Sequence, residues 1–305
     1  MNSAGRMKGF KAPASTPHPS GSAWHLLPQG EKGDAGHPNR YALPMTQAAP
    51  APVKIAIAGA LGRMGRAVAA TCEGRDDVVV AARFERPGVE GEGLVSIDEA
   101  LSLADVVVDF TTPEASVALA EKAAGRGGVA LVIGSTGLSQ DQTRRIDEAA
   151  SRIAIVRAGN FSLGVNLLMG MVRQAAAALG PKDFDIEIHE AHHNRKVDSP
   201  SGTALMLGEA AAAGRGVALK DVMVPARHGL NGPRTEGEIG FSVTRAGGII
   251  GEHSVLFASE EEIITFSHSA RDRGLFARGA LVAAKWAAGR GAGAYDMQDV
   301  LGLRG

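Results

Sequence analysis

The residues best suited to chemistry lie in one short polar segment, residues 190–205, with the sequence EAHHNRKVDSPSGTAL. The segment contains two adjacent histidines, His192 and His193, and a lysine, Lys196. A histidine with an ordinary pKa of about 6.5 exchanges protons near neutral pH, and a lysine can donate a proton or bind a carboxylate. The segment therefore predicts a site that transfers protons and binds an anion.

The flanking sequence predicts how this segment is held. A strand-like run at 185–190 precedes it, and an apolar helical run at 204–211 follows. The polar cluster is thus expected on a loop between a strand and a helix. If Ser201 is the helix N-cap, the free N–H groups of Gly202 and Thr203 and the positive end of the helix dipole form a site for a carboxylate or phosphate.

A glycine-rich turn near the start of the regular sequence predicts nucleotide binding. The β-branched run 53–58 is followed by GALGRMG at 59–65 and by a helical stretch that continues to about Cys72. Strand, glycine turn and helix in this order open a dinucleotide-binding unit, because the glycines let the backbone approach a pyrophosphate at the helix N-terminus.

A second apolar strand, 78–82, ends in a pair of charges that fits the adenosine half of such a cofactor. Glu85 follows Gly59 at about the 20-residue spacing at which an acidic side chain meets the ribose hydroxyls. Arg86 beside it can bind a 2′-phosphate through two parallel hydrogen bonds. The pair indicates that both NADH and NADPH are tolerated.

Alternating strands and helices continue to residue 156. Strands are expected at 105–110, 129–133 and 153–156, and helices at 113–126 and 139–152. Repeated βα units predict an α/β fold with a Rossmann-like, doubly wound parallel sheet whose ligands bind at the carboxyl ends of the strands. Small and hydrogen-bonding residues that could line a nicotinamide channel there are Gly134, Ser135, Thr136, Ala158, Gly159, Asn160 and Phe161.

The pattern changes after Ser162. A long apolar helix is expected at 163–179, and strands without intervening helices at 238–244, 253–257 and 262–267. This order is typical of an α+β domain with a mixed, largely antiparallel sheet.

The last helix, expected at 275–288, can return to the first domain and make it discontinuous. Met45 lies shortly before the first strand, and we expect it to be the native start. The expected units are a disordered extension at 1–51, a dinucleotide-binding domain formed by 52–162 and 273–305, and a substrate-binding domain at 163–272.

Composition excludes several classes of function. The 305-residue chain has a formal net charge of -1 and 4% aromatic residues, which argues against a nucleic-acid surface. No stretch is long and apolar enough to be expected to cross a membrane. Its single cysteine, Cys72, excludes an internal disulfide or a thiolate metal cluster, fits a reducing cytoplasmic compartment, and is expected to be a buried thiol.

The chain resembles the dihydrodipicolinate reductase family, also called 4-hydroxy-tetrahydrodipicolinate reductases, from Val53 to the C-terminus. The most specific part of the resemblance is the polar segment from Glu190 to Ala204. Shorter motifs that support it are Gly62-Arg63-Met64-Gly65, Asp109-Phe110-Thr111, Gly134-Ser135-Thr136-Gly137 and Asn160-Phe161-Ser162.

The resemblance implies a role for each matching position. His192 matches the general acid/base and Lys196 the proton donor, whereas His193, Gly202 and Thr203 match substrate-binding positions. Ser201, the expected cap of the same helix, is also expected to bind substrate. The implied pyrophosphate contacts are Gly59, Ala60, Gly62, Arg63 and Met64, with Glu85 at the ribose and Arg86 near a 2′-phosphate. The implied nicotinamide contacts are Gly134, Ser135, Thr136, Ala158, Gly159, Asn160 and Phe161.

The implied reaction is hydride transfer from NADH or NADPH to a cyclic, conjugated dicarboxylate, with loss of water and formation of tetrahydrodipicolinate for lysine and diaminopimelate synthesis. The resemblance also implies a homotetramer joined through the sheets of the second domain. No metal is expected.

Other functions compete with this interpretation. One is another NAD(P)-dependent dehydrogenase acting on an amino acid or sugar acid, and a second is a non-catalytic NAD(P)-sensing regulator; neither requires the whole polar segment. A metal hydrolase that uses His189, His192 and His193 is the weakest alternative, because this spacing matches none of the common zinc motifs.

Overall fold

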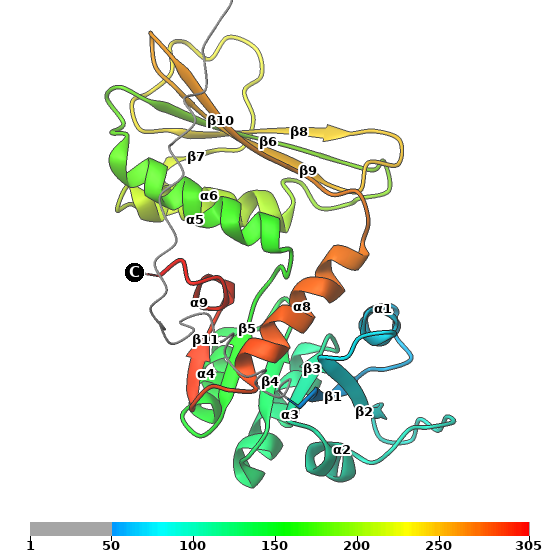
Figure 1. Cartoon of the computed structure of the whole chain (residues 1–305). Helices are drawn as coiled ribbons and strands as arrows, with labels where there is room; N and C mark the ends of the chain where they lie inside the picture. Colours follow the sequence, from blue (N-terminus) through cyan, green and yellow to red (C-terminus); the bar gives the residue numbers. More distant parts are fainter. Residues whose placement is uncertain (1–50, 305) are drawn as a thin grey trace, which may run out of the picture. The chain divides into compact units, whose positions relative to one another are not determined.

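The first sheet of the protein contains six parallel strands. The computed structural model describes residues 51–304, and in it the strands lie in the order β11-β5-β4-β3-β1-β2 (Figure 1). Every residue of β3 and β4 is buried, which explains their continuous apolar sequences. The strands are β1 (Val53–Ala58), β2 (Val78–Phe84), β3 (Val106–Asp109), β4 (Ala130–Ile133), β5 (Ala154–Arg157) and β11 (Gly293–Tyr295).

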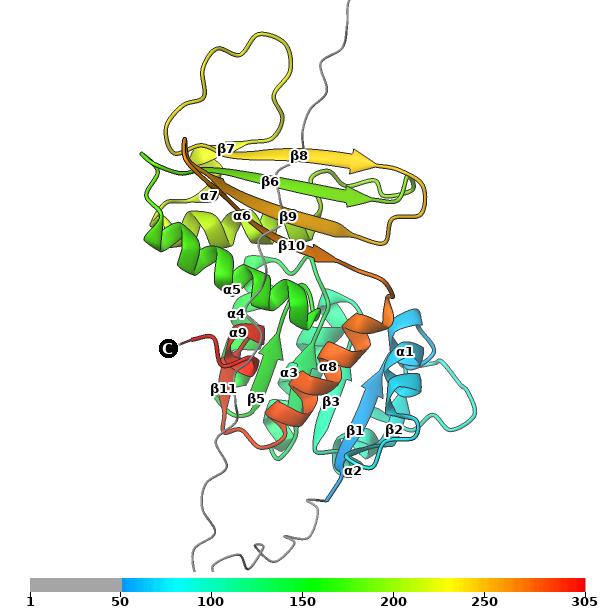
Figure 2. The same cartoon turned by 45° about the horizontal axis from the view of Figure 1, so that its top comes forward.

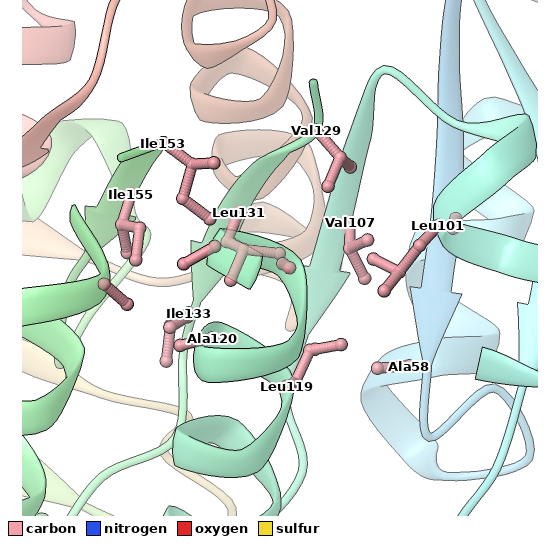
Figure 3. Close-up of a cluster of buried hydrophobic side chains, with 14 of the residues drawn as sticks. Ala58, Leu101, Val107, Leu119, Ala120, Val129, Leu131, Ile133, Ile153 and Ile155 are labelled. Carbon is pink, nitrogen blue, oxygen red and sulfur yellow. The ribbon is translucent and has the colours of Figure 1, made fainter. Parts of the chain in front are cut away.

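Helices cover both faces of this sheet. Apolar side chains of α2, α3 and α4 pack around Leu131 and Ile133 (Figure 3), whereas α1 and α8 pack on the opposite face with Ile55 and Ile57. A parallel sheet between two helical layers is doubly wound, so the predicted α/β class is confirmed. The helices are α1 (Arg63–Cys72), α2 (Ile97–Leu103), α3 (Pro113–Arg126), α4 (Gln140–Ala150), α8 (Gly274–Ala287) and α9 (Met297–Val300).

The strand and helix pattern of the sequence does not predict α2. Its signal is local: Ser96 Oγ accepts a hydrogen bond of 3.2 Å from the backbone N–H of Glu99, and the first turn is acidic. A helix of only seven residues is too short for its hydrophobic period to stand out.

A second sheet follows β5 in the sequence. It has the order β10-β9-β6-β8-β7, and α5 and α6 lie side by side along one of its faces (Figures 1 and 2). Its strands are β6 (Asp185–His192), β7 (Met223–Val224), β8 (Ile239–Arg245), β9 (Glu252–Ala258) and β10 (Ile263–Ser269). The accompanying helices are α5 (Leu163–Ala178), α6 (Gly202–Gly214) and α7 (Leu219–Val222).

This second sheet is mixed, as predicted. The pairs β6–β9 and β9–β10 are antiparallel, whereas β6–β8 and β7–β8 are parallel. The parallel pair follows from α6, because a helix between β6 and β8 provides the crossover that parallel neighbours need.

Residues far apart in the sequence complete the first sheet. After β10 the chain returns through α8, which contacts α1, β3, β4 and β5 and forms a 2.6 Å ion pair between Lys285 and Asp77. β11 then pairs in parallel with β5. The predicted extension at 1–51 and the start at Met45 lie outside the described residues, apart from Ala51.

Two further sequence-based expectations concern the thiol of Cys72 and membrane-spanning helices within residues 51–304. Cys72 is buried in α1, and burial raises the pKa of its thiol, so the expectation of a buried thiol is confirmed. Within the same residues, no helix is both long enough and apolar enough to span a lipid bilayer.

The packing of α8 predicts a strong effect of one small substitution. Gly279 lies against the carbonyl of Phe161, and a Cβ atom at this position would overlap the carbonyl oxygen. We expect Gly279→Ala to lower the free energy of unfolding by at least about 2 kcal/mol, measured by urea denaturation. The control is Gly125→Ala in α3, where nothing lies within 4 Å of the new methyl group. Equal stability of the two variants would contradict this account of the packing.

Candidate active site

A cleft of about 700 Å³ brings together most of the predicted functional residues. It lies between segments that follow strands of the first sheet and the end of β6 with the start of α6. The predicted residues that line it are Met64, Gly134, Thr136, Gly159, Asn160, Phe161, His192, His193, Lys196, Ser201, Gly202 and Thr203.

The strand β6 carries the first histidine into this cleft. β6 ends at His192, two residues beyond the predicted strand end at 190, so the expectation that Ala191 and His192 lie on a loop is wrong. The strand continues because neighbours on both sides pair with it, His192 with Arg245 of β8 and Ala191 with Glu252 of β9. Since side chains alternate along a strand, Glu190 and His192 project from the same face.

Glu190 is the centre of a buried hydrogen-bond network. Its Oε2 lies 2.6 Å from His192 Nδ1, and its Oε1 accepts a 2.9 Å hydrogen bond from the backbone N–H of Ser201. Both terminal guanidinium nitrogens of Arg245 donate to this carboxylate at 2.8 Å. Burial alone would raise the pKa of Glu190, but the bonds from Arg245, His192 and Ser201 hold it below its ordinary value.

A second histidine, His253 on β9, packs against His192. The two rings are 5.2 Å apart and nearly perpendicular, and His253 Nε2 lies 3.3 Å from Ser201 Oγ. Burial and the neighbouring His192 lower the pKa of His253 to about 4. His253 is therefore uncharged at neutral pH.

The loop after β6 presents Lys196. Its backbone N–H donates to the carbonyl of His193 at 3.1 Å, and its Nζ forms a 2.9 Å ion pair with Asp198. This ion pair lowers the pKa of Asp198. His193 also lines the cleft, and burial followed by the charge of Arg195 lowers its pKa.

The start of α6 has open backbone donors, which an anion site requires. Ser201 is the N-cap, as predicted, and its Oγ accepts from the backbone N–H of Ala204 at 3.2 Å. Among residues 51–304, no hydrogen bond engages the N–H groups of Gly202 and Thr203. These two donors and the helix dipole are available to a carboxylate in the cleft.

A hydrogen bond connects this helix to the first sheet. Asn160, which follows β5, donates through Nδ2 to Thr203 Oγ1 at 3.0 Å. The same side chain accepts from the backbone N–H of Ser162 at 2.8 Å, so its orientation is determined at both ends. The predicted nicotinamide segment and the predicted substrate segment therefore meet at this bond.

The glycine turn after β1 has the geometry of a phosphate cradle. Gly59 adopts a φ of 63°, and a Cβ atom on Gly65 would overlap the carbonyl oxygen of Gly59. Gly62 is the N-cap of α1 and offers no side-chain acceptor, so the first N–H groups of α1 remain open to a ligand. Glu85 Oε1 accepts from the backbone N–H of Leu61 at 2.8 Å, which ties the predicted ribose-binding carboxylate to the turn.

Two of the predicted nicotinamide residues point away from the cleft. Ser135 is buried and its hydroxyl bonds Ser116 at 2.8 Å; Ser116 in turn donates to Asp109 at 2.5 Å. Asp109 accepts the last hydrogen bond of this series, and burial raises the pKa of its carboxyl group. Ala158 lines a separate crevice with Arg157. Gly134 does line the cleft, where a Cβ atom would overlap the ring of Phe110.

The remaining predicted cofactor residues belong to the glycine turn and to the segment after β2. Gly59, Ala60, Gly62 and Arg63 form the glycine turn, and Met64 at its end lines the cleft and links the two regions. Arg86 is exposed after β2.

The three histidines of the metal hypothesis do not converge. His189 projects from the opposite face of β6 to His192, and its Nδ1 lies 2.9 Å from Ser242 Oγ. In the part of the chain that the structure describes, no group of three or more His, Cys, Asp and Glu residues could hold a metal ion.

Several residues of the cleft and of the buried network behind His192 have no role in the sequence-based prediction. Glu190 could have been found, because a strand that continues to His192 places both residues on one face. Arg245, His253 and Arg273 come from β8, β9 and the start of α8, and no local pattern connects them to the polar segment. Other unpredicted lining residues are Phe110, Asp198, Met206, Ile250 and Phe276.

Comparisons with known proteins match most of the described region. The family profile for the N-terminus of dihydrodipicolinate reductase matches residues 53–161, and that for the C-terminus matches residues 164–301. The 4-hydroxy-tetrahydrodipicolinate reductase of Caulobacter vibrioides is 69% identical over 83% of this chain and 98% of its own length. The enzyme of that name from Roseobacter denitrificans is 52% identical, with the same two coverages of 83% and 98%.

Solved structures share the fold. A dipicolinate-bound dihydrodipicolinate reductase from Paenisporosarcina sp. TG-14 superposes with a TM-score of 0.67 at 22% identity, over 81% of this chain and 98% of that one. A myo-inositol dehydrogenase from Corynebacterium glutamicum gives a TM-score of 0.52 at 14% identity, over 83% and 93% of the two chains. At these identities the likeness concerns the fold alone.

The buried His253 predicts a pH dependence of stability. Its pKa in the folded protein, about 4, lies below its ordinary value of 6.5, so the unfolded chain binds the additional proton as the pH falls below 6.5. The contribution to the free energy of unfolding therefore decreases from pH 6.5 to pH 4, at about 1.4 kcal/mol per pH unit. We expect His253→Gln to remove this slope in urea denaturation curves recorded over that range.

The matched control for this measurement is His189→Gln on β6, a histidine whose ring is partly exposed beside Ser242. Every titrating group except His253 and His189 is common to both variants. A pH slope of stability that is lost only in His253→Gln is therefore due to His253. An unchanged slope in His253→Gln would contradict the assignment of a buried, neutral ring.

Proposed function

The chain belongs to the dihydrodipicolinate reductase family, and we propose that it reduces 4-hydroxy-tetrahydrodipicolinate to tetrahydrodipicolinate with loss of water, using NADH or NADPH, in lysine and diaminopimelate synthesis. The family profiles together match residues 53–161 and 164–301. The observation that carries the proposal is a single cleft that contains His192, Lys196 and the N-terminus of α6 and that continues at Met64 to the glycine turn.

The residues of the glycine turn fit a nicotinamide dinucleotide. Gly59 and Gly65 leave a backbone surface that a larger side chain would obstruct, and the uncapped start of α1 offers N–H donors to a pyrophosphate. We assign the pyrophosphate to Gly59, Ala60, Gly62, Arg63 and Met64. When bound, the reduced nicotinamide supplies the hydride for the reaction.

The adenosine end is assigned to the pair after β2. Glu85 uses Oε1 for the backbone N–H of Leu61, which leaves Oε2 for a ribose hydroxyl. Arg86 is exposed beside it and can bind a 2′-phosphate. Gly134, Thr136, Gly159, Asn160 and Phe161 are proposed to border the nicotinamide; Ser135 and Ala158 contribute through the backbone, because their side chains do not line the cleft.

The substrate half of the cleft suits a dicarboxylate. The N–H groups of Gly202 and Thr203 and the dipole of α6 can hold one carboxylate, and His193 stands beside them. Lys196 is proposed to donate the proton that the ring accepts during reduction, and His192 to act as the general acid/base. His192 is buried against Glu190 and His253, which excludes water from one side of its imidazole.

We also propose the division of the chain and its assembly. Residues 52–162 and 273–305 would bind the nucleotide, and residues 163–272 would bind substrate and join four subunits in the cytoplasm. Support comes from the second sheet: among residues 51–304, helices pack on one of its faces, and Ile263 of β10 is 65% exposed. Light scattering that gave the mass of a single chain would contradict the tetramer.

Two alternatives make different predictions. A dehydrogenase for another amino acid or sugar acid would oxidise reduced cofactor with a different carbonyl compound, and a sensor would bind the nucleotide without turnover. Neither alternative explains why His192, Lys196 and the start of α6 line the same cleft.

The first test is oxidation of NADH and, separately, NADPH, with substrate generated in place from pyruvate and aspartate semialdehyde by the preceding synthase. We expect turnover with at least one cofactor, and a loss of at least about 100-fold in kcat for Lys196→Ala, because a positioned acid contributes that much to a proton transfer. Nucleotide binding without any oxidation would overturn the proposed function.

The same assay separates proton transfer from binding. His192→Ala should mainly lower kcat, whereas Thr203→Val removes a hydroxyl at the anion site and should mainly raise KM. If both variants lowered kcat and raised KM to the same extent, the assignment of His192 to proton transfer and of Thr203 to binding would be wrong.

Cofactor preference provides a further prediction. Because Arg86 is assigned to the 2′-phosphate, Arg86→Ala should raise the KM for NADPH by about tenfold and leave that for NADH within about twofold, as expected for one lost charged hydrogen bond. The control is Arg83→Ala, an exposed arginine on β2, three residues before Arg86. A parallel rise for both cofactors would contradict the assignment.

A further inference from the structure

We propose that Glu190, held by Arg245, is a positioning residue that fixes the imidazole of His192 with its proton on Nδ1 and directs Nε2 to the cleft. The carboxylate at the same time holds the N-terminus of α6 beside that nitrogen. This inference rests on the proposed function, because it specifies how the general acid/base of that reaction is prepared.

The first step of the argument concerns hydrogen-bond capacity. An ionised carboxylate has about four acceptor positions and no donor. Glu190 is fully buried, and four donors surround it: the two guanidinium nitrogens of Arg245 at 2.8 Å, the Ser201 N–H at 2.9 Å and His192 Nδ1 at 2.6 Å. Every acceptor position is therefore used inside the protein.

The second step concerns ionisation and the tautomer of His192. The bonds that surround Glu190 hold its pKa below the ordinary value, and Arg245 remains charged, so the carboxylate is ionised and can only accept. His192 Nδ1 must then donate its hydrogen to Oε2. Nε2 is left as the nitrogen that can exchange a proton with a bound substrate, since His192 lines the cleft.

The third step concerns charge around the ring. The groups facing His192 from the packed elements are mostly cationic or neutral: Arg245 on β8, His253 on β9, and Lys196 and Arg273 at the cleft. Asp198 is directed to Lys196 at 2.9 Å. Among residues 51–304, Glu190 is the carboxylate in direct contact with His192, so it compensates the charge of a protonated imidazole.

The fourth step is mechanical. Glu190 bonds the Ser201 N–H, and Arg245 also donates to the carbonyl of Asp198 at 2.7 Å. One buried ion pair thereby joins the end of β6, the loop that carries Lys196 and the N-cap of α6. The imidazole, the lysine and the anion site are held in one arrangement before substrate binds.

A direct test is the tautomer of His192, read from its imidazole ¹⁵N chemical shifts in the protein without substrate. In the unaltered protein at high pH we expect the Nδ1–H form. In Glu190→Gln the amide NH₂ can face Nδ1, which then has to accept, so the Nε2–H form is expected. An Nε2–H tautomer in the unaltered protein would overturn the proposal whether or not the variant folds.

Kinetics provide the second test. Glu190→Gln should lower kcat by about 100-fold or more, as for loss of the carboxylate that orients a catalytic imidazole, while KM changes less than about tenfold. A rise in KM with kcat unchanged would assign Glu190 a purely structural role and contradict the inference.

Two further variants control the experiment. Glu187→Gln removes a carboxylate on the same strand that pairs with Arg227 at 2.7 Å, on the face away from His192, and should leave kcat within about twofold. Arg245→Lys keeps the positive charge but loses the two parallel bonds, and should lower kcat less than Glu190→Gln does. If the unaltered protein has no reductase activity, the proposed function fails, and the tautomer measurement still decides the inference.

Discussion

A buried ion pair between Glu190 and Arg245 organises the polar centre of this protein. Removing a carboxylate from water is costly unless donors replace the water, and here four donors do so within 2.9 Å. Those donors come from β6, β8 and the start of α6, so satisfying one charge determines the relative positions of three elements. The positions of His192 and of the start of α6 follow from that requirement, because His192 Nδ1 and the Ser201 N–H are two of the four donors.

The cleft also depends on the junction with the first sheet. Asn160 follows β5 and bonds Thr203 in the first turn of α6, while Phe110 and Phe161 pack edge to face with centroids 5.4 Å apart. Gly134 has to be small because Phe110 occupies the space of its side chain. The proposed nucleotide half and the proposed substrate half are thus built against one another by short-range contacts, which suits a reaction between two bound molecules.

Much of the architecture follows from local pattern. The helix predicted at 113–126 has those bounds in the structure, because proline occupies its first turn and Gly127 ends it with a φ of 73°. The end of β6 and the short strand β11 are different. Each exists because neighbouring strands, distant in the sequence, supply hydrogen bonds, and single-segment periodicity contains no information about those partners.

The sequence by itself determined the α/β order, the glycine turn, the N-cap at Ser201 and the presence of His192 and Lys196 in one segment. These features could be predicted because periodicity, capping and turn chemistry act over a few residues. Tertiary structure decided that Glu190 faces His192, that Arg245 and His253 join them, and that Ser135 turns inward. These contacts join residues up to 63 positions apart, from Glu190 to His253. Only the packing of a complete sheet brings these side chains together, because the cost of burying the Glu190 carboxylate is recovered when its hydrogen-bond partners are in place.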